Sequence, residues 1–342
     1  MILISSLSGY YQVVIIILNN FLDLFILSFS PWPSFFYVLP FSFHFHFSSD
    51  YSGKKVFKGS VFNSAGEITG IGELYMKIAV CGKGGSGKST ISALLAKEMA
   101  KTKNVLVLDI DESNYGLHSQ LGMVAPKDLM EYFGGKTGFK EKQRAAPKKT
   151  QFLGLAASGS TSGQPAQQKS RFFDKRWSFS DLPPEFVEEK DGVKLMAVGK
   201  IHNFGEGCAC PMGVLTREFL ENLDLGKDDL VIVDTEAGTE HFGRGVDKDF
   251  DLILVVVDPS YESLRLSKKF DEFGAQCGCK VYFVLNKVEP DIREEMLASV
   301  NCTNVVAEIP ERREIFKTSL KGKELNLELD EIKKLAEFLR KS

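Results

Sequence analysis

One glycine-rich segment has the residue types and the spacing of a phosphate-binding loop. It fits the pattern G-x-x-x-x-G-K-[ST] and reads Gly82-Lys83-Gly84-Gly85-Ser86-Gly87-Lys88-Ser89-Thr90. Glycines let backbone N–H groups turn inward around phosphate oxygens, and a following helix adds its positive N-terminal end. Lys88 can span the β- and γ-phosphates, and the Ser89 hydroxyl can bind Mg²⁺. We therefore predict that this segment holds a nucleoside triphosphate.

Charged and polar residues follow several apolar runs of strand length. Two of these positions are Asp109 and Asp111, a third is Asp234, and a fourth is the pair Asn286-Lys287. Ligands of α/β proteins bind at the carboxyl ends of strands, so these positions suit the same nucleotide site. The alternative is that they are ordinary strand-end residues without a role in binding.

A pair of thiols with one residue between them forms a second centre of possible chemistry. Residues 205–211 read G-E-G-C-A-C-P, so the pair is Cys208 and Cys210. Such neighbours do not easily close a disulfide, but they can present two thiolates toward one point. Two subunits related by a two-fold axis would supply four sulfurs, which suits tetrahedral Zn²⁺, and soft thiolates also suit Ni²⁺. The alternative is two thiols that bind no metal.

The cysteine content also indicates a compartment. The chain has six cysteines, at Cys81, Cys208, Cys210, Cys277, Cys279 and Cys302. Their spacing gives no spread-out disulfide framework, which favours a reducing, cytoplasmic location. We expect Cys81 and Cys302 to be structural and Cys277 and Cys279 to be core or surface thiols, with any further role of that second pair left open.

The phosphate loop resembles a particular variant of the motif. The order Lys-Gly-Gly-x-Gly-Lys-Ser at residues 83–89 resembles the ATPase class that includes MinD, ParA, the arsenite-pump ATPase and nitrogenase iron protein. The resemblance implies that Lys83 reaches across a dimer to the partner's nucleotide. It implies that Asp111 polarises the attacking water, that Asp109 lies near the Mg²⁺ shell, and that Asp234 holds Mg²⁺ through water. Residues 235–238 would sense the γ-phosphate.

A closer resemblance rests on the cysteine segment together with residues 236–245, which read E-A-G-T-E-H-F-G-R-G. Both look like the accessory ATPases that insert nickel into carbon monoxide dehydrogenase, the CooC type. The likeness runs from Met76 to the C-terminus and leaves out the first 75 residues and a stretch after Pro147. It implies a homodimer that uses ATP and Mg²⁺, holds Ni²⁺ or Zn²⁺ between subunits on Cys208 and Cys210, and serves carbon monoxide dehydrogenase as client.

The residues after the strand at 281–285 favour ATP over GTP. Asn286-Lys287 resembles a base-contacting element, but a G protein would continue with x-Asp, and Val288-Glu289 stands here instead. Residues 234–237, D-T-E-A, also lack the glycine of the G-protein D-x-x-G switch. We therefore expect adenine to be the base that is bound.

Strand and helix patterns alternate along the chain from residue 76 onward. Helical patterns cover 88–101, 261–273 and 331–341, and apolar runs of strand length cover 77–81, 105–108, 193–198, 230–233, 252–257 and 281–285. Such alternation predicts an α/β fold with a mostly parallel sheet flanked by helices. Together with the loop motif, it predicts a P-loop NTPase like MinD or nitrogenase iron protein.

Two stretches differ from this pattern. Residues 1–75 are rich in Phe, Ser, Ile and Leu, and we expect them to come from a mis-assigned start, with Met76 opening a single ATPase domain to residue 342. A membrane anchor at 12–29 is the alternative, although Asn19, Asn20 and Asp23 interrupt that run. Residues 134–184 are polar and basic, which predicts a solvated insertion or, alternatively, a segment that docks an acidic client.

Overall composition limits the classes of function. The net charge is -3 over 342 residues, so nothing predicts a nucleic-acid partner. The main prediction is an ATP-driven metallochaperone. Two alternatives stay open: a positioning or partition ATPase of the MinD/ParA kind, and an iron–sulfur scaffold or reductase. The chain end lacks the strongly basic amphipathic helix that membrane targeting would favour.

Overall fold

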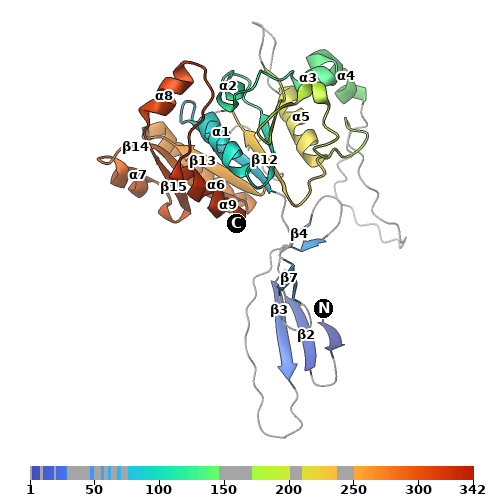
Figure 1. Cartoon of the computed structure of the whole chain (residues 1–342). Coiled ribbons are helices and arrows are strands. Elements are labelled where there is room, and N and C mark those ends of the chain that lie inside the picture. Colours follow the sequence, from blue (N-terminus) through green and yellow to red (C-terminus); the bar gives the residue numbers. More distant parts are fainter. Residues whose placement is uncertain are drawn as a thin grey trace. The chain divides into compact units, whose positions relative to one another are not determined.

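The computed structural model describes the chain in several stretches (Figure 1). Backbone and side chains are described for residues 76–145, 172–200, 210–236 and 250–342, without the side chains of Gln143, Ala145, Cys210 and Cys277. Before residue 76, only the backbone of short strands is described. The chain divides into two compact units, and the described residues from Met76 onward all belong to the second.

Short antiparallel strands make up the described part of the first unit. They form one three-stranded sheet and two hairpins: β1 (Ile2–Leu7), β2 (Tyr11–Leu18), β3 (Phe21–Ser28), β4 (Phe47–Ser49), β5 (Lys55–Phe57), β6 (Val61–Phe62) and β7 (Ile68–Gly70). The apolar run at 12–29 therefore lies over two strands. Among the helices that the structure describes, none is both long and apolar enough to cross a bilayer.

An eight-stranded sheet is the centre of the second unit as far as it is described. Its order is β10-β11-β9-β12-β8-β13-β14-β15, and only β10 runs antiparallel to its neighbour. The strands are β8 (Met76–Gly82), β9 (Asn104–Asp109), β10 (Glu188–Lys190), β11 (Val193–Ala197), β12 (Asp229–Asp234), β13 (Leu252–Val257), β14 (Lys280–Val288) and β15 (Val305–Pro310). The predicted mostly parallel sheet is confirmed, and β10 and β15 are additions to it.

Helices connect these strands and cover both faces of the sheet (Figure 1). They are α1 (Lys88–Met99), α2 (Leu117–Leu121), α3 (Leu129–Tyr132), α4 (Gly135–Ala145), α5 (Cys210–Glu221), α6 (Tyr261–Cys277), α7 (Arg293–Ser299), α8 (Arg313–Leu320) and α9 (Asp330–Lys341), with 3₁₀ turns at Pro184–Phe186 and Cys302–Asn304. The predicted helical patterns at 88–101, 261–273 and 331–341 correspond to α1, α6 and α9.

Alternating side chains of the strands build two separate cores. In β8, Ile78 and Val80 face the core that includes α1 and α9, whereas Ala79 and Cys81 face the core that includes α5 and α6. Successive strand residues point to opposite faces, so a strand covered on both sides reads as a continuous apolar run. This is why the central strands were visible in the sequence. The two cores fix the carboxyl ends of the strands at one edge.

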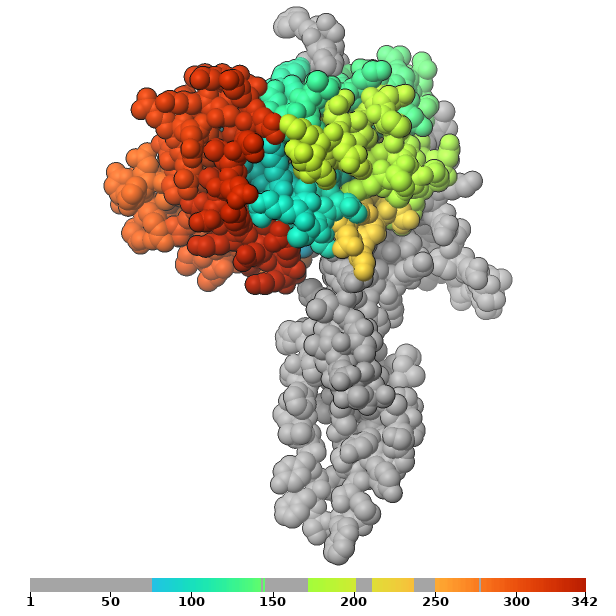
Figure 2. Space-filling model, in the orientation of Figure 1, coloured from blue at the N-terminus to red at the C-terminus, as the bar shows by residue number. Residues whose placement is uncertain are grey.

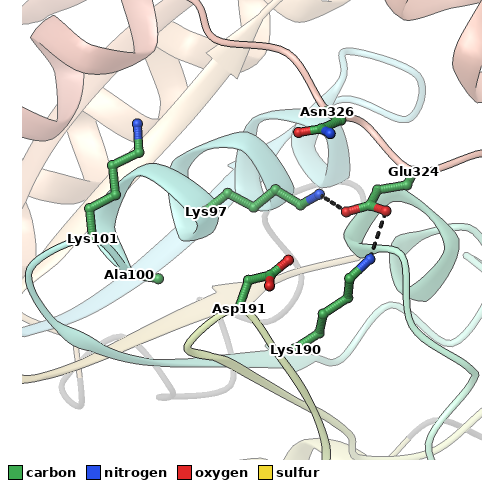
Figure 3. A pocket seen from close by; sticks show the side chains of 7 residues that line it. All are labelled: Lys97, Ala100, Lys101, Lys190, Asp191, Glu324 and Asn326. Atoms are coloured by element: carbon green, nitrogen blue, oxygen red, sulfur yellow. Dashed lines mark hydrogen bonds and ion pairs between the residues drawn. The ribbon is translucent and has the colours of Figure 1, made fainter.

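Two segments that are distant from α1 in the sequence lie beside it. On the face shown in Figure 2, the part of the chain with α1 lies between the C-terminal segment and residues 172–200. Glu324 joins them, because its carboxylate oxygens lie 2.6 Å from Lys97 Nζ and 2.7 Å from Lys190 Nζ (Figure 3). These residues line a cavity of about 370 Å³. Lys97 is nine residues along α1 from Lys88, about 14 Å away, so the cavity is separate from the phosphate loop.

The insertion at 134–184 departs from the solvated segment that its composition predicts. Its described ends belong to the core, since Phe139, Phe173, Trp177 and Leu182 are buried there. The rings of Phe173 and Trp177 meet edge to face at 4.9 Å, an arrangement that adds to the stabilisation from burial. A few aromatic residues outweigh the many lysines, because each buries a large apolar area. Residues 146–171 lie outside the described part.

Candidate nucleotide-binding site

The phosphate loop lies between β8 and α1, as predicted. Gly82 and Gly87 have φ values of 147° and 100°, which side chains other than glycine rarely adopt. A Cβ on Gly82 would lie 2.4 Å from the carbonyl oxygen of Val256 in β13. The two glycines are therefore required by the close approach of the loop to the sheet. The helix N-terminus that follows offers unpaired N–H groups to an anion.

Ser89 and Asp234 lie together directly below this loop. Ser89 Oγ donates to Asp234 Oδ2 at 2.6 Å, and Ser92 Oγ donates to Asp234 Oδ1 at 3.0 Å. Burial raises the pKa of Asp234 to about 6, although these hydroxyls and Lys88 oppose the rise. A buried carboxylate beside a hydroxyl is an oxygen set that Mg²⁺ accepts. The residues present therefore fit a nucleotide-bound magnesium ion, as their types predict.

Asp109 and Asp111 begin a loop at the end of β9, the strand next to β12. Asp109 Oδ1 accepts from the backbone N–H of Asp111 at 3.1 Å, and Asp109 Oδ2 accepts from Lys200 Nζ at 2.6 Å. Burial raises the pKa of Asp109 to about 7, and the positive charge of Lys200 partly offsets this. Asp111 Oδ1 accepts from both the N–H and the hydroxyl of Ser113. The structure thus brings the predicted acids of β9 and β12 to one edge.

Several residues of the site were not singled out in the sequence. They are Lys200, Asn114, Ser92 and Asp258. Asn114 Nδ2 donates to Ser89 Oγ, so the loop after β9 reaches the hydroxyl that is predicted to bind magnesium. Lys200 and Asp258 each stand just after a strand, β11 and β13, so the strand-end rule could have found them. Ser92 gave no signal, because it lies within α1 and its role depends on the neighbouring strand.

Lys83 forms an ion pair within its own chain in this structure. Its Nζ lies 3.9 Å from Asp258 Oδ2, and its side chain is 31% exposed. Ser260 Oγ holds the other carboxylate oxygen of Asp258 at 2.6 Å. Asp258 itself is buried, so the pair is only partly exposed to solvent. In this structure Lys83 therefore pairs with an acid of its own chain, and its reach to a partner's nucleotide stays a prediction.

Asn286 and Lys287 lie against the phosphate loop. Asn286 Nδ2 donates to the carbonyl oxygen of Ser86 at 2.7 Å, and Lys287 Nζ donates to that of Gly85 at 2.7 Å. Lys287 has a φ of 58°, in the left-handed region. In this structure both side chains support the loop, and their contact with a base stays a prediction.

The predicted metal ligands fall mostly outside the described residues. Cys208 lies in the segment 201–209, and Cys210 is the first residue of α5, without a described side chain. The predicted switch at residues 235–238 is described only as far as Glu236, because residues 237–249 also lie outside the description. Across the stretches that are described, no three His, Cys, Asp or Glu side chains are grouped to hold a metal ion. The cysteine site therefore stays a prediction.

Two of the remaining cysteines differ in environment. Cys81 is fully buried behind the phosphate loop, and burial raises the pKa of its thiol to about 12. A thiol with such a pKa stays protonated and unreactive at neutral pH, consistent with the expected structural role. Cys302 is exposed.

Known proteins resemble this chain in sequence. The family model for the CobQ/CobB/MinD/ParA nucleotide-binding domain matches residues 77–325. An uncharacterised ATP-binding protein of Methanocaldococcus jannaschii is 51% identical over 267 residues, which cover 78% of this chain and all of that protein. The carbon monoxide dehydrogenase accessory protein CooC of Rhodospirillum rubrum is 30% identical over 216 residues, which cover 62% of this chain and 74% of CooC.

Solved structures agree on the fold. The septum site-determining protein MinD of Pyrococcus horikoshii, complexed with Mg-ADP, has a TM-score of 0.54 at 17% identity and covers 78% of this chain and 96% of its own. MinD of Pyrococcus furiosus has a TM-score of 0.52 at 19% identity and covers 78% and 99%. With its phosphate loop, buried acids and ATP-binding relatives, the chain is an ATPase that belongs to the CobQ/CobB/MinD/ParA nucleotide-binding family.

Proposed function

We propose that this ATPase works as a dimer that delivers a metal ion, with nickel insertion into carbon monoxide dehydrogenase as the specific task. The observation that carries the proposal is the C-x-C pair at the start of α5, in a chain 30% identical to CooC. The pair follows Lys200 by only eight residues, and Lys200 contacts the acids of the nucleotide site.

The thiolates of Cys208 and Cys210 suit the cargo. Each subunit would supply two sulfurs, and a two-fold axis between subunits would complete a four-sulfur site. Such a site accepts Zn²⁺ and Ni²⁺, with geometry deciding between them. Protons compete with the metal for thiolates, so metal affinity falls at acid pH. A shared site would also open when the dimer opens, which is a route for release.

Residues at the edge of the sheet support a partner subunit there. Tyr115 after β9 is 52% exposed, Tyr261 after β13 is 74% exposed, and Phe316 after β15 is 63% exposed. Large apolar side chains exposed near a ligand site can contribute to an interaction surface. All three come after the carboxyl ends of parallel strands, the edge of the sheet at which the nucleotide site lies. We propose that a second copy of the chain covers this edge when ATP is bound.

The chain's own residues would then perform hydrolysis at that interface. Lys88 binds the β- and γ-phosphates, and Ser89 with Asp234 holds the magnesium ion. When bound, that ion neutralises the charge that develops on the phosphate oxygens. Asp111 orients the attacking water with the carboxylate oxygen that accepts no hydrogen bond from the described residues. Lys83 leaves Asp258 for the nucleotide and so contributes to dimer closure.

Metal stoichiometry and mass in solution test the proposal together. The reduced full-length protein is loaded with Ni²⁺ or Zn²⁺, with and without ATP, and compared with the Cys208→Ser/Cys210→Ser variant. Cys302→Ser, which changes an exposed cysteine elsewhere, is the matched control. We expect one metal ion per two chains, lost in the double variant and retained in the control.

Other results would select the alternatives. A dimer that forms with ATP but holds no metal on the cysteines would replace metal delivery with a positioning role of the MinD kind. A brown protein after anaerobic purification would indicate an iron–sulfur cluster instead. Full metal content in the double serine variant would remove Cys208 and Cys210 as ligands.

A further inference from the structure

Lys200 is a buried lysine, and each donor of its ammonium group has an acceptor within the chain. It follows β11 and is 9% exposed. Its Nζ donates to Asp109 Oδ2 at 2.6 Å, to the carbonyl oxygen of Asp111 at 2.5 Å and to that of Asn114 at 2.6 Å. An ammonium group has three donors, so each one has an acceptor. All three acceptors belong to one stretch, residues 109–114.

These contacts hold the chain both before and after Asp111. Before it, Asp109 is held by Lys200 through one carboxylate oxygen and holds the Asp111 N–H through the other. After it, the carbonyls of Asp111 and Asn114 are bound directly. The backbone at both ends of the residue that orients water is therefore fixed to one ammonium group. A neutral side chain could supply neither three donors nor a charge for the buried carboxylate.

The same stretch also reaches the magnesium ligands. Asn114 Nδ2 donates to Ser89 Oγ, and its Oδ1 accepts from the N–H of Gly116. Because Lys200 binds the carbonyl of Asn114, it fixes the residue that contacts Ser89. Lys200 is itself anchored, since its N–H donates to Asp128 Oδ2 at 2.9 Å. One side chain thus connects the water-orienting residue with the hydroxyl that binds the ion.

We propose that Lys200 is a positioning residue for ATP hydrolysis, which holds residues 109–114 so that Asp111 and Ser89 keep their places relative to the γ-phosphate. It acts through Asp109, Asp111 and Asn114, which accept the three hydrogen bonds of its ammonium group. The inference rests on the proposed roles of Asp111 and Ser89 in ATP hydrolysis, and it is independent of whether Cys208 and Cys210 hold a metal ion.

Steady-state kinetics of Lys200→Met test this role. Misplacing a reacting group by about 1 Å costs about 100-fold in rate, so we expect kcat to fall about 10- to 100-fold. The phosphate loop keeps its own contacts in this variant, so the Kd for ATP should change less than about threefold. The loss of activity should therefore appear in kcat and not in ATP binding. Lys97→Met is the matched control, because it removes an ammonium that pairs with Glu324 outside the site. Its kcat should stay at the wild-type value.

A second variant separates positioning from stability. Lys200→Met leaves the Asp109 carboxylate buried without its cation, which destabilises the fold. In Lys200→Met/Asp109→Asn that charge is gone, so the melting temperature should recover while kcat stays low. This variant decides the matter if the single variant fails to fold. Recovery of wild-type kcat together with stability would overturn the proposal, and so would wild-type kcat in Lys200→Met.

Combining Lys200→Met with Asp111→Asn gives a third readout. If Lys200 acts through Asp111, the double variant should be no slower than Asp111→Asn alone, because residues that act as a unit are non-additive. A merely structural role would give losses that multiply. Multiplied losses in kcat would therefore count against the proposal.

Discussion

Asn286 Nδ2 donates a hydrogen bond to the carbonyl oxygen of Ser86, 200 residues earlier in the chain, at 2.7 Å. The next residue, Gly87, has a φ of 100°, and a Cβ built on it would lie 2.3 Å from that same nitrogen. The amide of Asn286 therefore occupies the space that a side chain at 87 would need. Asn286 in β14 therefore packs against the glycine that precedes α1 without room for a side chain there.

This contact predicts different effects for two glycines with similar backbones. Gly85 has a φ of 81°, but a Cβ there would meet no atom within 4 Å. Gly85→Ala should add only the cost of a left-handed residue, about 1–2 kcal/mol. Gly87→Ala adds a collision with Asn286, so its Kd for ATP should rise well beyond that of Gly85→Ala. Isothermal titration with ATP measures the Kd of both variants. Equal affinities would mean that the Asn286 side chain moves aside at no cost.

Lys88→Ala should abolish nucleotide turnover. Lys88 is 6% exposed at the base of the phosphate loop, and a lysine there supplies the charge that stabilises the transferring phosphate. We expect kcat to fall at least about 100-fold, the loss typical of removing one strong electrostatic contact. Phosphate release measures it, and Lys97→Ala on the same helix is the control. Retained turnover in Lys88→Ala would refute the loop assignment.

Asp111→Asn should preserve ATP binding and slow hydrolysis strongly. The amide keeps the shape of the side chain but cannot polarise water as a carboxylate does. We expect ATP-bound dimers to accumulate, since the step that reopens them is slow. Asp191→Asn is the matched control, because Asp191 is exposed and has a φ of 51° that asparagine accepts. Light scattering with ATP checks the mass, and wild-type hydrolysis in Asp111→Asn would remove Asp111 from this role.

The buried acids predict opposite pH trends for stability and for magnesium use. Burial raises the folded-state pKa of Asp234 to about 6 and that of Asp109 to about 7, from 3.8. Groups with raised pKa values contribute stability that is complete below pH 3.8 and lost as pH rises through about 6 and 7. Magnesium needs the carboxylate, so its affinity should fall as pH drops below about 6.

ATPase assays at varied Mg²⁺ concentration between pH 5 and 8 check the second trend. The half-saturating Mg²⁺ concentration should rise by up to about tenfold for each pH unit below the pKa of Asp234, because one proton then competes with the ion. Saturating Mg²⁺ should restore the rate, provided that the fold is intact by circular dichroism. A half-saturating concentration independent of pH would show that Asp234 does not titrate in this range.

Some features of this protein could be predicted from short segments of the sequence alone. The loop at 82–90 needs glycines, a lysine and a hydroxyl at fixed spacing, so the motif alone located it. The central strands are buried on both faces and therefore read as continuous apolar runs. The edge strand β15 was not predicted, because Val305 to Ala307 are only half-buried and the apolar run is short. The strand-end positions of Asp109, Asp111 and Asp234 followed from the same runs.

The tertiary structure decided which of these residues meet. The order of strands in the sheet sets β9 beside β12 and β11 beside β9, and so brings Lys200 to Asp109 across 91 residues. It likewise brings Phe173 and Trp177 of a lysine-rich insertion into the core. Local sequence carries no record of such neighbours, because contacts across the sheet depend on how distant segments pack. The motif therefore indicated the chemistry of the phosphate loop. The packing of distant segments placed the buried ammonium group of Lys200 beside Asp109.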